Sequence, residues 1–375
     1  MSGGRGGPEF HIERLSARAY TIPTDRPEAD GTLSWQKTTI VVVHAHEASG
    51  RTGLGYSYAA GAAADVVAEI LAPSVCGGDA LSPPAAWERM RRAVRNIGYP
   101  GVAAGAISAV DVALWDLKAR LLELPLSSLL GSVREAVPAY GSGGFTSYPD
   151  EVLEQQLGEW AAQGLSAVKM KVGSEPERDA QRVRRAREAI GPDTRLFVDA
   201  NGAYERKQAL RMAELFLSDT GADWFEEPVS SDDLEGLRLL RDRVPAPMQI
   251  AAGEYGYDVF YFRRMLEAGA VDVLQADVTR CGGVTAMLQV GALCAAAGVP
   301  LSAHTSPTLH AHVGAAIQPL VHVEYFHDHA RIEQMLFDGV PALRAGCLHP
   351  DRGAPGLALE LREQDAERWL SGGGG

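Results

Sequence analysis

The segment SAVKMKVGSEPERDAQRVRRAREAIGPDTRLFVDAN (residues 166–201) decides the fold. It begins with a run that predicts a strand, continues with the amphipathic pattern of a helix over 176–190, and ends with a second strand-like run over 195–201. Two strands of one sheet that are joined through a helix run parallel, with a right-handed crossover. The segment therefore predicts one βα unit of a parallel sheet.

The same alternation of strand and helix continues to residue 326. Eight short strand-like runs follow one another, and patterns typical of amphipathic helices separate nearly all of them. The runs are VPAYGS (137–142), SAVKMKV (166–172), RLFVDAN (195–201), ADWFEEP (222–228), MQIAAGE (248–254), VDVLQAD (271–277), PLSAHT (300–305) and VHVEYF (321–326). Eight such units favour an α/β fold in which the strands close into a TIM-like (β/α) barrel rather than an open sheet.

The first third of the chain has a different order of elements. Two strand patterns come first, over 11–22 and 38–46, and a polar loop over 23–34 joins them. A Gly-rich turn follows over 49–58. Three helical patterns come after it, over 59–71, 82–97 and 103–122. This order predicts a separate α+β module ahead of the barrel.

Each predicted barrel strand after the first ends on an ionisable residue. These residues are Lys171, Asp199, Glu226, Glu254, Asp277, His304 and Glu324. In a (β/α) barrel the carboxyl ends of the strands meet at one mouth, where the active groups of such enzymes lie. Independent surface charges would not occupy seven successive strand ends. We therefore expect these side chains to form one functional site.

Three of these residues, Asp199, Glu226 and Glu254, come from consecutive strands. Three carboxylates directed at one space repel one another unless a cation holds them. All-oxygen ligation favours Mg²⁺, with Mn²⁺ as an alternative, over zinc, which prefers His or Cys. The sequence therefore predicts a magnesium site with open positions for a small-molecule carboxylate substrate, toward which the metal acts as a Lewis acid.

Lys171 and His304 lie on strands far apart around the ring, so we expect them to face the substrate from opposite sides. The cation and Lys169, two residues earlier on the same strand face, should lower the pKa of Lys171 and make it a general base. Asp277 is placed to orient His304, and Glu324, if protonated, could hydrogen-bond a substrate carboxylate oxygen. This set predicts removal of a proton α to a carboxylate, through an enediolate.

The strand ends and the first third of the chain also carry recognisable motifs. They are KMK (169–171), VDAN (198–201), FEEP (225–228), GE (253–254), Asp277 ahead of CGG, SAHTSP (302–307), AISAVDVALWDLKAR (106–120) and LPLSSLLG (124–131). Together these motifs resemble those of the enolase superfamily, mandelate racemase subgroup, over nearly the whole chain. The resemblance implies a (β/α)7β barrel with an α+β capping domain and Mg²⁺ bound by the Asp of DxN and by two Glu.

The same resemblance assigns individual residues. Glu226, the first Glu of FEEP, matches the metal-ligand position, and Glu227 does not. Asn201 matches a neighbour of the metal, and Ser142 matches a serine that touches substrate in the racemase. Arg280 stands where the racemase has a lysine.

The expected domain division follows from these two parts. The capping domain would span residues 1–135, with a first loop at 20–34 and a second at 49–58. The barrel would span 136–335, and residues 336–375 would return toward the cap.

Two reactions fit this site. The leading hypothesis is dehydration of an acid sugar to a 2-keto-3-deoxy acid, and the alternative is a racemase or epimerase of a 2-hydroxy acid. The cap loops favour the first, because their polar side chains suit a polyhydroxylated substrate. These side chains are Asp25, Arg26, Glu28, Asp30, Arg51, Tyr56 and Tyr58, of which we expect Arg26 and Tyr56 to bind substrate. A metal-binding scaffold without catalysis is the alternative from another class, and it would show no Mg²⁺-dependent exchange of an α-proton.

Composition limits the partners. The net charge of −13 argues against nucleic acid and against an anionic membrane. Four scattered cysteines form neither a disulfide framework nor a zinc cluster. The first ten residues lack the apolar segment of a signal peptide. No apolar run is long enough to span a membrane. We expect a cytoplasmic protein and, by analogy with related proteins, a homo-oligomer.

Three pairs of histidines two residues apart suggest zinc, but no third ligand of the same kind accompanies them. The pairs are His44/His46, His310/His312 and His327/His329. Because no cysteine or third histidine completes a site, we expect none of the pairs to bind metal. His327 or His329 could instead line the mouth of the barrel after Glu324.

Overall fold

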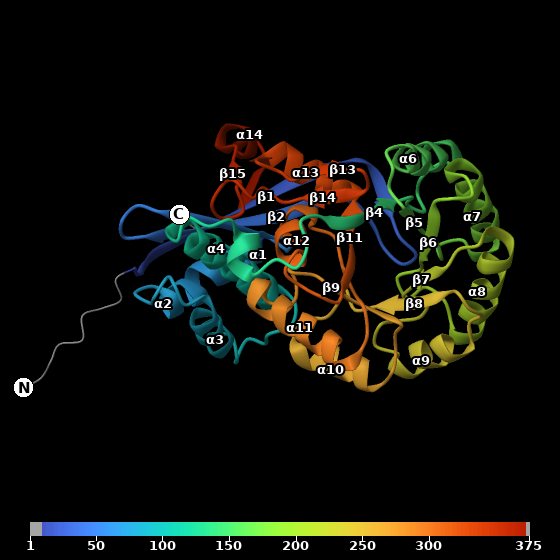
Figure 1. Ribbon diagram of the computed structural model, residues 1–375, viewed down its shortest axis with the longest axis horizontal. Helices are drawn as coiled ribbons and strands as arrows, with labels where there is room; N and C mark the ends of the chain where they lie inside the picture. Colours follow the sequence, from blue (N-terminus) through green and yellow to red (C-terminus); the bar gives the residue numbers. More distant parts are fainter. Residues whose placement is uncertain (1–9, 373–375) are drawn as a thin grey trace, which may run out of the picture.

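Eight parallel strands close into a barrel in the computed structural model, which describes residues 10–372 (Figure 1). The strands are β4 (Val137–Gly143), β5 (Ala167–Lys171), β6 (Arg195–Asp199), β7 (Trp224–Glu226), β8 (Gln249–Ala252), β9 (Val273–Ala276), β10 (Leu301–Ala303) and β11 (Leu320–Phe326). The last strand pairs in parallel with the first, with Glu324 opposite Tyr140. This pairing leaves no open edge between β11 and β4, so the predicted barrel is confirmed.

Seven helices cover the outside of the barrel, one after each of the first seven strands (Figure 1). They are α6 (Asp150–Ala162), α7 (Pro176–Ile190), α8 (Arg206–Thr220), α9 (Leu234–Arg243), α10 (Val259–Glu267), α11 (Gly283–Ala297) and α12 (Pro307–Gly314). The predicted (β/α)7β order is therefore correct. Inside the barrel, Tyr140, Phe197 and Trp224 belong to one buried cluster, with Phe197 and Trp224 stacked 4.9 Å apart.

Local sequence sets the ends of several barrel helices. The Asp258 carboxylate accepts a hydrogen bond from the amide of Tyr261 and so caps the start of α10, and Asp233 caps α9 in the same way. Gly221 and Gly298 end α8 and α11 in the left-handed conformation, which glycine adopts without steric cost. These caps fix where each helix returns the chain to the next strand.

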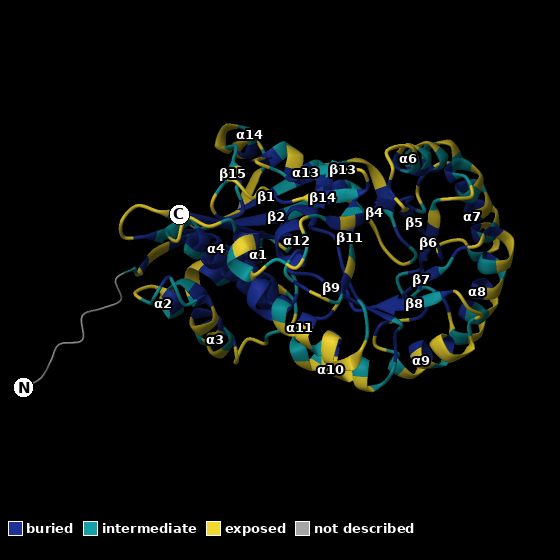
Figure 2. Cartoon of the chain, in the orientation of Figure 1, coloured by how far each residue is buried: buried dark blue, intermediate teal, exposed yellow. Residues whose placement is uncertain are grey.

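The cap is built on an antiparallel sheet in the order β16-β1-β2-β3. Its strands are β1 (Ile12–Ala29), β2 (Ser34–Glu47), β3 (Thr52–Ser57) and β16 (Leu370–Gly372). Its helical part comprises α1 (Ala62–Val66), a π-helical turn (Val67–Leu71), α2 (Ala72–Val75), α3 (Pro83–Ala93), α4 (Val102–Leu121) and α5 (Leu126–Leu130). Helix α4 is buried almost throughout (Figure 2).

Two glycines of β3 allow α4 to lie directly against the sheet. A Cβ atom at Gly53 or Gly55 would stand 2.3 Å from the carbonyl oxygen of Ala113 or Ala109, closer than atoms can approach. The Gly-rich sequence over 49–58 therefore serves close packing of a strand on a helix. We expected a loop over all of 49–58; residues 49–51 do form the turn before β3, but 52–57 are strand, because glycines that serve close packing suggest a turn when read locally.

The predicted loop over 23–34 is also largely strand. Strands β1 and β2 continue as a hairpin, paired as far as Ala29 and Ser34, with a shift of register between Pro23 and Glu28. The hairpin reaches past the cap sheet toward the barrel, where Thr146 donates its amide hydrogen to the carbonyl of Ala29. Few residues of such a projecting hairpin are buried on either side, so its sequence lacks the alternation that predicts a strand.

The C-terminal part of the chain runs from the barrel back to the cap. Its elements are α13 (His327–Leu336), β12 (Phe337–Asp338), β13 (Ala342–Arg344), β14 (Cys347–His349), β15 (Glu360–Leu361) and α14 (Glu363–Glu367), followed by β16. Strand β14 pairs with β4 of the barrel, and β16 pairs with β1 of the cap. The boundaries at 135 and 335 stay predictions. Between residues 10 and 372, no helix is long and apolar enough to cross a membrane.

Candidate active site

The ionisable residues predicted at the strand ends meet at one mouth of the barrel. Lys171, Asp199 and Glu226 are the last residues of β5, β6 and β7. The other four lie just after their strands or near the end of β11, and they are Glu254, Asp277, His304 and Glu324. None of the seven is more than 6% exposed. Their charges therefore interact with one another in a region with little water, where electrostatic interactions are strong.

Three of these carboxylates form a cluster. One oxygen each from Asp199, Glu226 and Glu254 lies within 4.8 Å of the others. Oxygen Oε2 of Glu254 has no hydrogen-bond donor among residues 10–372, although His304 Nε2 lies 3.0 Å away. Glu227, buried beside the cluster, also has an unpartnered oxygen.

The electrostatics of the mouth agree with a cation at this cluster. The carboxyl groups of Asp199, Glu226, Glu227, Glu254, Asp277 and Glu324 outnumber the basic groups of Lys169, Lys171, Arg280 and His304. Burial and repulsion from Asp199 raise the pKa of Glu226 to about 8, against the opposing effect of Lys169. An all-oxygen donor set with excess negative charge fits a hard divalent cation such as Mg²⁺.

Lys169 is enclosed by carboxylates. Its Nζ lies 2.7 Å from each oxygen of Glu226, 2.8 Å from Glu324 Oε1 and 3.2 Å from Asp199 Oδ2. Burial would lower the pKa of Lys169, but these carboxylates, Glu226 first, outweigh it and raise the pKa well above its usual value. Lys169 therefore stays a cation that holds the surrounding carboxylates in place.

Lys171 reaches the substrate side of the same cluster. Its Nζ donates to Asp199 Oδ2 at 2.5 Å and to Asn201 Oδ1 at 3.0 Å. Burial would lower the pKa of Lys171, but Asp199, together with Glu254 and Glu226, outweighs burial and raises it. Lys169 acts to lower the pKa of Lys171, as we expected, but the contact with Asp199 acts in the opposite direction, and the sequence could not show that contact. The lowering that we expected from a bound cation stays a prediction.

His304 and Asp277 form a dyad. His304 Nδ1 lies 2.9 Å from Asp277 Oδ2, and Asp277 Oδ1 accepts hydrogen bonds from the amide and the hydroxyl of Thr279. Burial would lower the pKa of His304, but Glu254 and Glu324 outweigh it and raise the pKa to about 9. The ring is therefore held in one orientation and carries a proton near neutral pH.

Glu324 is ionised rather than protonated. Its Oε1 accepts a hydrogen bond from Ser142 Oγ at 2.6 Å, and its Oε2 accepts one from the amide of Thr305 at 3.1 Å. Burial would raise the pKa of Glu324, but Lys169, together with His304 and Lys171, outweighs burial and holds the pKa at about 2. Glu324 could donate a hydrogen bond to a substrate carboxylate only if it were protonated, and this condition is not met; Ser142 is engaged with Glu324.

Strained backbone surrounds these groups. Asn201, Glu227, Thr305 and Ser306 adopt positive φ angles of 45°, 37°, 51° and 42°, which non-glycine residues rarely adopt. All four lie within three residues after the ends of barrel strands β6, β7 and β10. Such strain persists only where the surrounding structure determines it, and it is typical of active sites.

A cavity of about 280 Å³ lies between this mouth and the cap hairpin. The barrel contributes Lys171, Asn201, Glu254, Tyr255, Arg280, His304, Thr305, Glu324, Phe326 and, from α13, His329. The hairpin contributes Asp30, Leu33, Trp35 and Thr38. The pocket is therefore closed by two parts of the chain far apart in sequence.

Two predicted substrate contacts do not lie at this cavity. Tyr56 is fully buried and donates its hydroxyl hydrogen to Glu333 at 2.6 Å, because successive residues of β3 point to opposite sides of the sheet. Arg26 is exposed and lines a neighbouring cavity with Tyr148 and His327. These positions correct our expectation for both residues.

Sequence reasoning did not identify several residues that do line the cavity. They are Leu33, Trp35, Thr38, Tyr255, Thr305 and Phe326. Tyr255 and Thr305 directly follow Glu254 and His304, so their positions next to predicted site residues were a usable signal. The hairpin residues gave no such signal, because their segment resembles a loop.

Comparison with known proteins identifies the family. Residues 17–131 match the mandelate racemase / muconate lactonizing enzyme, N-terminal domain, and residues 152–366 match the enolase C-terminal domain-like family. A solved structure of a mandelate racemase/muconate lactonizing enzyme-like protein from Rubrobacter xylanophilus is 55% identical, with a TM-score of 0.94, covering 96% of this chain and 100% of that one.

Two named relatives have the same sequence identity to this chain. The 3,6-anhydro-alpha-L-galactonate cycloisomerase of Streptomyces coelicolor is 33% identical, covering 93% of this chain and 97% of the relative. The L-talarate/galactarate dehydratase of Salmonella typhimurium is 33% identical, covering 97% of this chain and 91% of the relative. A structure of that dehydratase liganded with Mg and L-lyxarohydroxamate has a TM-score of 0.88 at 28% identity, covering 100% of this chain and 96% of that one. The chain therefore belongs to the mandelate racemase/muconate lactonizing enzyme family of the enolase superfamily and is an enzyme.

Proposed function

We propose that this enzyme removes the proton α to the carboxylate of an acid sugar and expels the β-hydroxyl, giving a 2-keto-3-deoxy acid. The observation that carries the proposal is the placement of Lys171 and His304. They come from β5 and β10, three strands apart across the β4–β11 closure, and both line one cavity beside the three-carboxylate cluster. The dehydratase among the characterised relatives supports the same reaction class.

In this proposal Asp199, Glu226 and Glu254 hold Mg²⁺, and Mn²⁺ is an alternative. The ion would supply Lewis-acid stabilisation of the negative charge that develops on the substrate carboxylate. Lys169 contacts both Glu226 and Glu324, and its ammonium favours the ionised form of each. The cluster's all-oxygen donors and the unpartnered oxygen of Glu254 support this assignment.

The protein groups then divide the proton transfers. Lys171 accepts the α-proton once its ammonium has released a proton to solvent and given up its contact with Asp199. His304, oriented by Asp277, donates its proton to the leaving β-hydroxyl, which departs as water. The electron pair of the broken C–H bond forms the new C=C bond, and the resulting enol gains a proton at C3 and loses its hydroxyl proton to become the 2-keto acid. No oxidant or reductant is needed.

The cavity walls support a substrate without a second carboxylate. The hairpin side presents Leu33, Trp35, Thr38 and Asp30, and within the described chain this side offers no lysine or arginine. The basic side chains lining the cavity all belong to the barrel. A distal carboxylate would therefore lie against Asp30 and apolar rings without a cation, whereas a neutral sugar end would fit.

The test is a screen of acid sugars with purified enzyme and Mg²⁺, read as 2-keto acid formed. We expect turnover of one or more aldonic acids and weak or no turnover of the corresponding aldaric diacids. Turnover of diacids alone would contradict the proposed distal wall but leave the reaction class intact. If no acid sugar gave a 2-keto acid, the dehydratase assignment would be wrong.

Racemisation or epimerisation of a 2-hydroxy acid is the second candidate. Basic groups from strands three apart around the ring line the cavity and favour it, because one could remove the α-proton and the other return a proton to the opposite face. It would show as inversion at C2 without keto acid in the same screen. A homo-oligomeric state and a cytoplasmic location stay predictions.

A further inference from the structure

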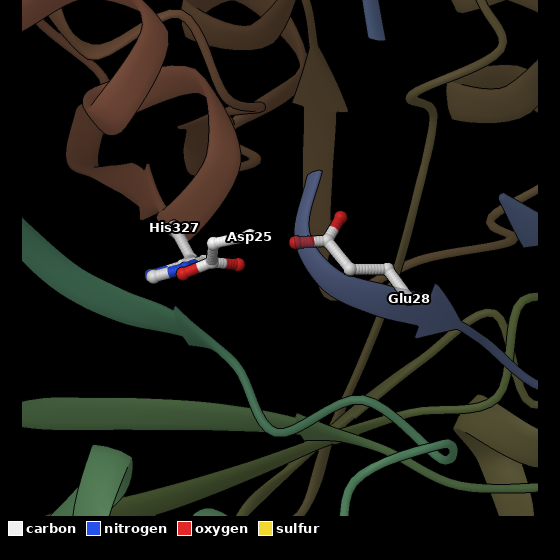
Figure 3. A group of neighbouring side chains, drawn as sticks. All are labelled: Asp25, Glu28 and His327. Atoms are coloured by element: carbon white, nitrogen blue, oxygen red, sulfur yellow. The ribbon is translucent and has the colours of Figure 1, made fainter. Parts of the chain in front are cut away.

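A second group of metal-ligating side chains lies where the cap hairpin meets the barrel. Asp25 and Glu28 come from β1, and His327 begins α13 directly after β11 (Figure 3). One ligand atom from each lies within 4.8 Å of the others. His327 Nε2 is already 2.9 Å from Asp25 Oδ2. Two segments from opposite ends of the sequence thus bring two carboxylates and an imidazole together.

The buried member of this group has an unused oxygen. Glu28 has no exposed surface, and its Oε2 accepts a hydrogen bond from the Trp35 indole at 2.8 Å. Its Oε1 has no hydrogen-bond partner among residues 10–372. The carboxylate is turned toward Asp25 and His327 (Figure 3). A buried oxygen without a partner is costly, and a cation bound between the three groups would satisfy it.

Among residues 10–372, the surroundings of Glu28 add negative charge from Asp328, and the basic group that acts on Glu28, Arg331, binds other acceptors. Asp328, next in sequence to His327, is fully buried and close enough to act electrostatically on Glu28. The guanidinium of Arg331 donates to Asp328 at 2.6 Å and to the carbonyl oxygen of Pro23 at 2.7 Å. Arg331 is therefore engaged with other acceptors, and the group Asp25, Glu28 and His327 lies in a region that favours a further cation.

We propose that Asp25, Glu28 and His327 form a second metal site, which takes a divalent transition ion of the zinc class and ties the cap hairpin to the barrel. Imidazole and two carboxylates are zinc ligands, whereas Mg²⁺ takes oxygen ligands. The side chains of Asp25 and His327 are 42% and 24% exposed, so an ion can enter from solvent. The sequence pattern did not predict this site. It suggested the pair His327/His329, whereas the other two ligands of His327's site are Asp25 and Glu28 of the cap.

The second site adjoins the catalytic cavity through Trp35. The Trp35 indole donates to Glu28 and its side chain also lines the catalytic cavity. An ion bound to Glu28 therefore holds one wall of the catalytic cavity and the hairpin that carries it. We expect the ion to slow opening of residues 23–33.

The experiment is a calorimetric titration of Zn²⁺ into the enzyme in the presence of excess Mg²⁺. One Zn²⁺ per chain should bind, and it should still bind in Asp199→Asn, in which the carboxylate cluster is impaired. In Glu28→Gln and in His327→Gln the affinity should fall at least about tenfold. Gln at position 28 can still accept from Trp35, and His327 is partly exposed, so both variants should fold. The matched control, His349→Gln, changes an exposed histidine on β14 and should leave the Zn²⁺ affinity unchanged.

Hydrogen exchange gives a second readout. Amide exchange over residues 23–33 should slow when Zn²⁺ is added to the wild type and to His349→Gln, but not to His327→Gln. Zn²⁺ binding that is lost in Asp199→Asn, or that is unchanged in both Glu28→Gln and His327→Gln, would overturn the proposal. Neither result depends on turnover, so the proposal stands or fails separately from the proposed reaction.

Discussion

Lys169 Nζ lies 2.7 Å from both carboxylate oxygens of Glu226, and neither side chain is exposed. The same ammonium lies 2.8 Å from Glu324. Lys169 does not line the catalytic cavity, so it acts on the reaction through the carboxylates that it holds. It is a positioning residue, whereas Lys171, two residues later, is placed to touch substrate.

Replacement of Lys169 by Met should therefore act on stability. The change leaves Glu226 and Glu324 buried without their cation, and breaking a buried ion pair on one side costs about 3–5 kcal/mol. The measurement is the free energy of unfolding in urea with EDTA present. Lys171→Met is the matched control and should cost less, because Lys171 contacts one carboxylate, that of Asp199. Equal losses in the two variants would contradict this division of roles.

Loss of any carboxylate of the cluster should remove the metal. Asp199→Asn, Glu226→Gln and Glu254→Gln should each weaken Mg²⁺ binding at least about tenfold and abolish turnover while the far-UV circular dichroism stays unchanged. Glu227→Gln is the control from the adjacent position and should weaken Mg²⁺ much less. Calorimetric Mg²⁺ titrations check both. Full activity in excess EDTA would rule out the assignment.

The hairpin should determine which substrates react. Trp35→Ala and Leu33→Ala alter the wall of the catalytic cavity, so the ratio of kcat/KM between two acid sugars with different distal ends should change by about tenfold or more. Arg26→Ala should leave this ratio unchanged, because Arg26 lines the neighbouring cavity. The same ratio in all three variants would show that the hairpin does not contact the substrate.

A buried histidine should make stability depend on pH. Burial lowers the pKa of His312 to about 4, and neither ring nitrogen has a hydrogen-bond partner among residues 10–372. The folded-state pKa is below the unfolded value of 6.5, so the stabilising effect is fully present above pH 6.5 and is lost as the pH falls toward 4. Each such group contributes about 1.4 kcal/mol per pH unit within that window. His312→Leu should therefore reduce the slope of the unfolding free energy against pH between 6.5 and 4. The control variant His349→Leu should keep the slope of the wild type. Equal slopes in the wild type and both variants would contradict this prediction.

The barrel and most of its mouth could be predicted because two regular signals coincide. Alternating strand and helix patterns gave the eight strands, and the rule that barrel strands end at one mouth gave Lys171, Asp199, Glu226 and the residues that follow. These inferences need only sequence spacing.

The cap could not be predicted equally well, because its details depend on contacts across the chain. The hairpin up to Ala29 contains Pro and Asp, which are typical of loops, and it is held by the barrel, through Thr146 for example. The hydroxyl of Tyr56 suggested a substrate contact, but it donates a hydrogen bond to Glu333 inside the protein. The pKa directions of Lys171 and Glu324 follow from distances to Asp199 and Lys169, which no spacing rule supplies.

The central claim is that Lys171 and His304 act on opposite faces of the α-carbon, and α-proton exchange in D₂O, followed by NMR with Mg²⁺ present, tests it most directly. His304→Asn should still exchange the α-proton of the substrate epimer that faces Lys171 but not that of the other epimer, and Lys171→Ala should show the reverse. Asp277→Asn should mimic the loss of His304, with exchange slowed by about 10²–10⁴-fold, because Asp277 orients the ring. Equal loss of exchange on both epimers in both variants, or no loss in either, would contradict the two-faced assignment.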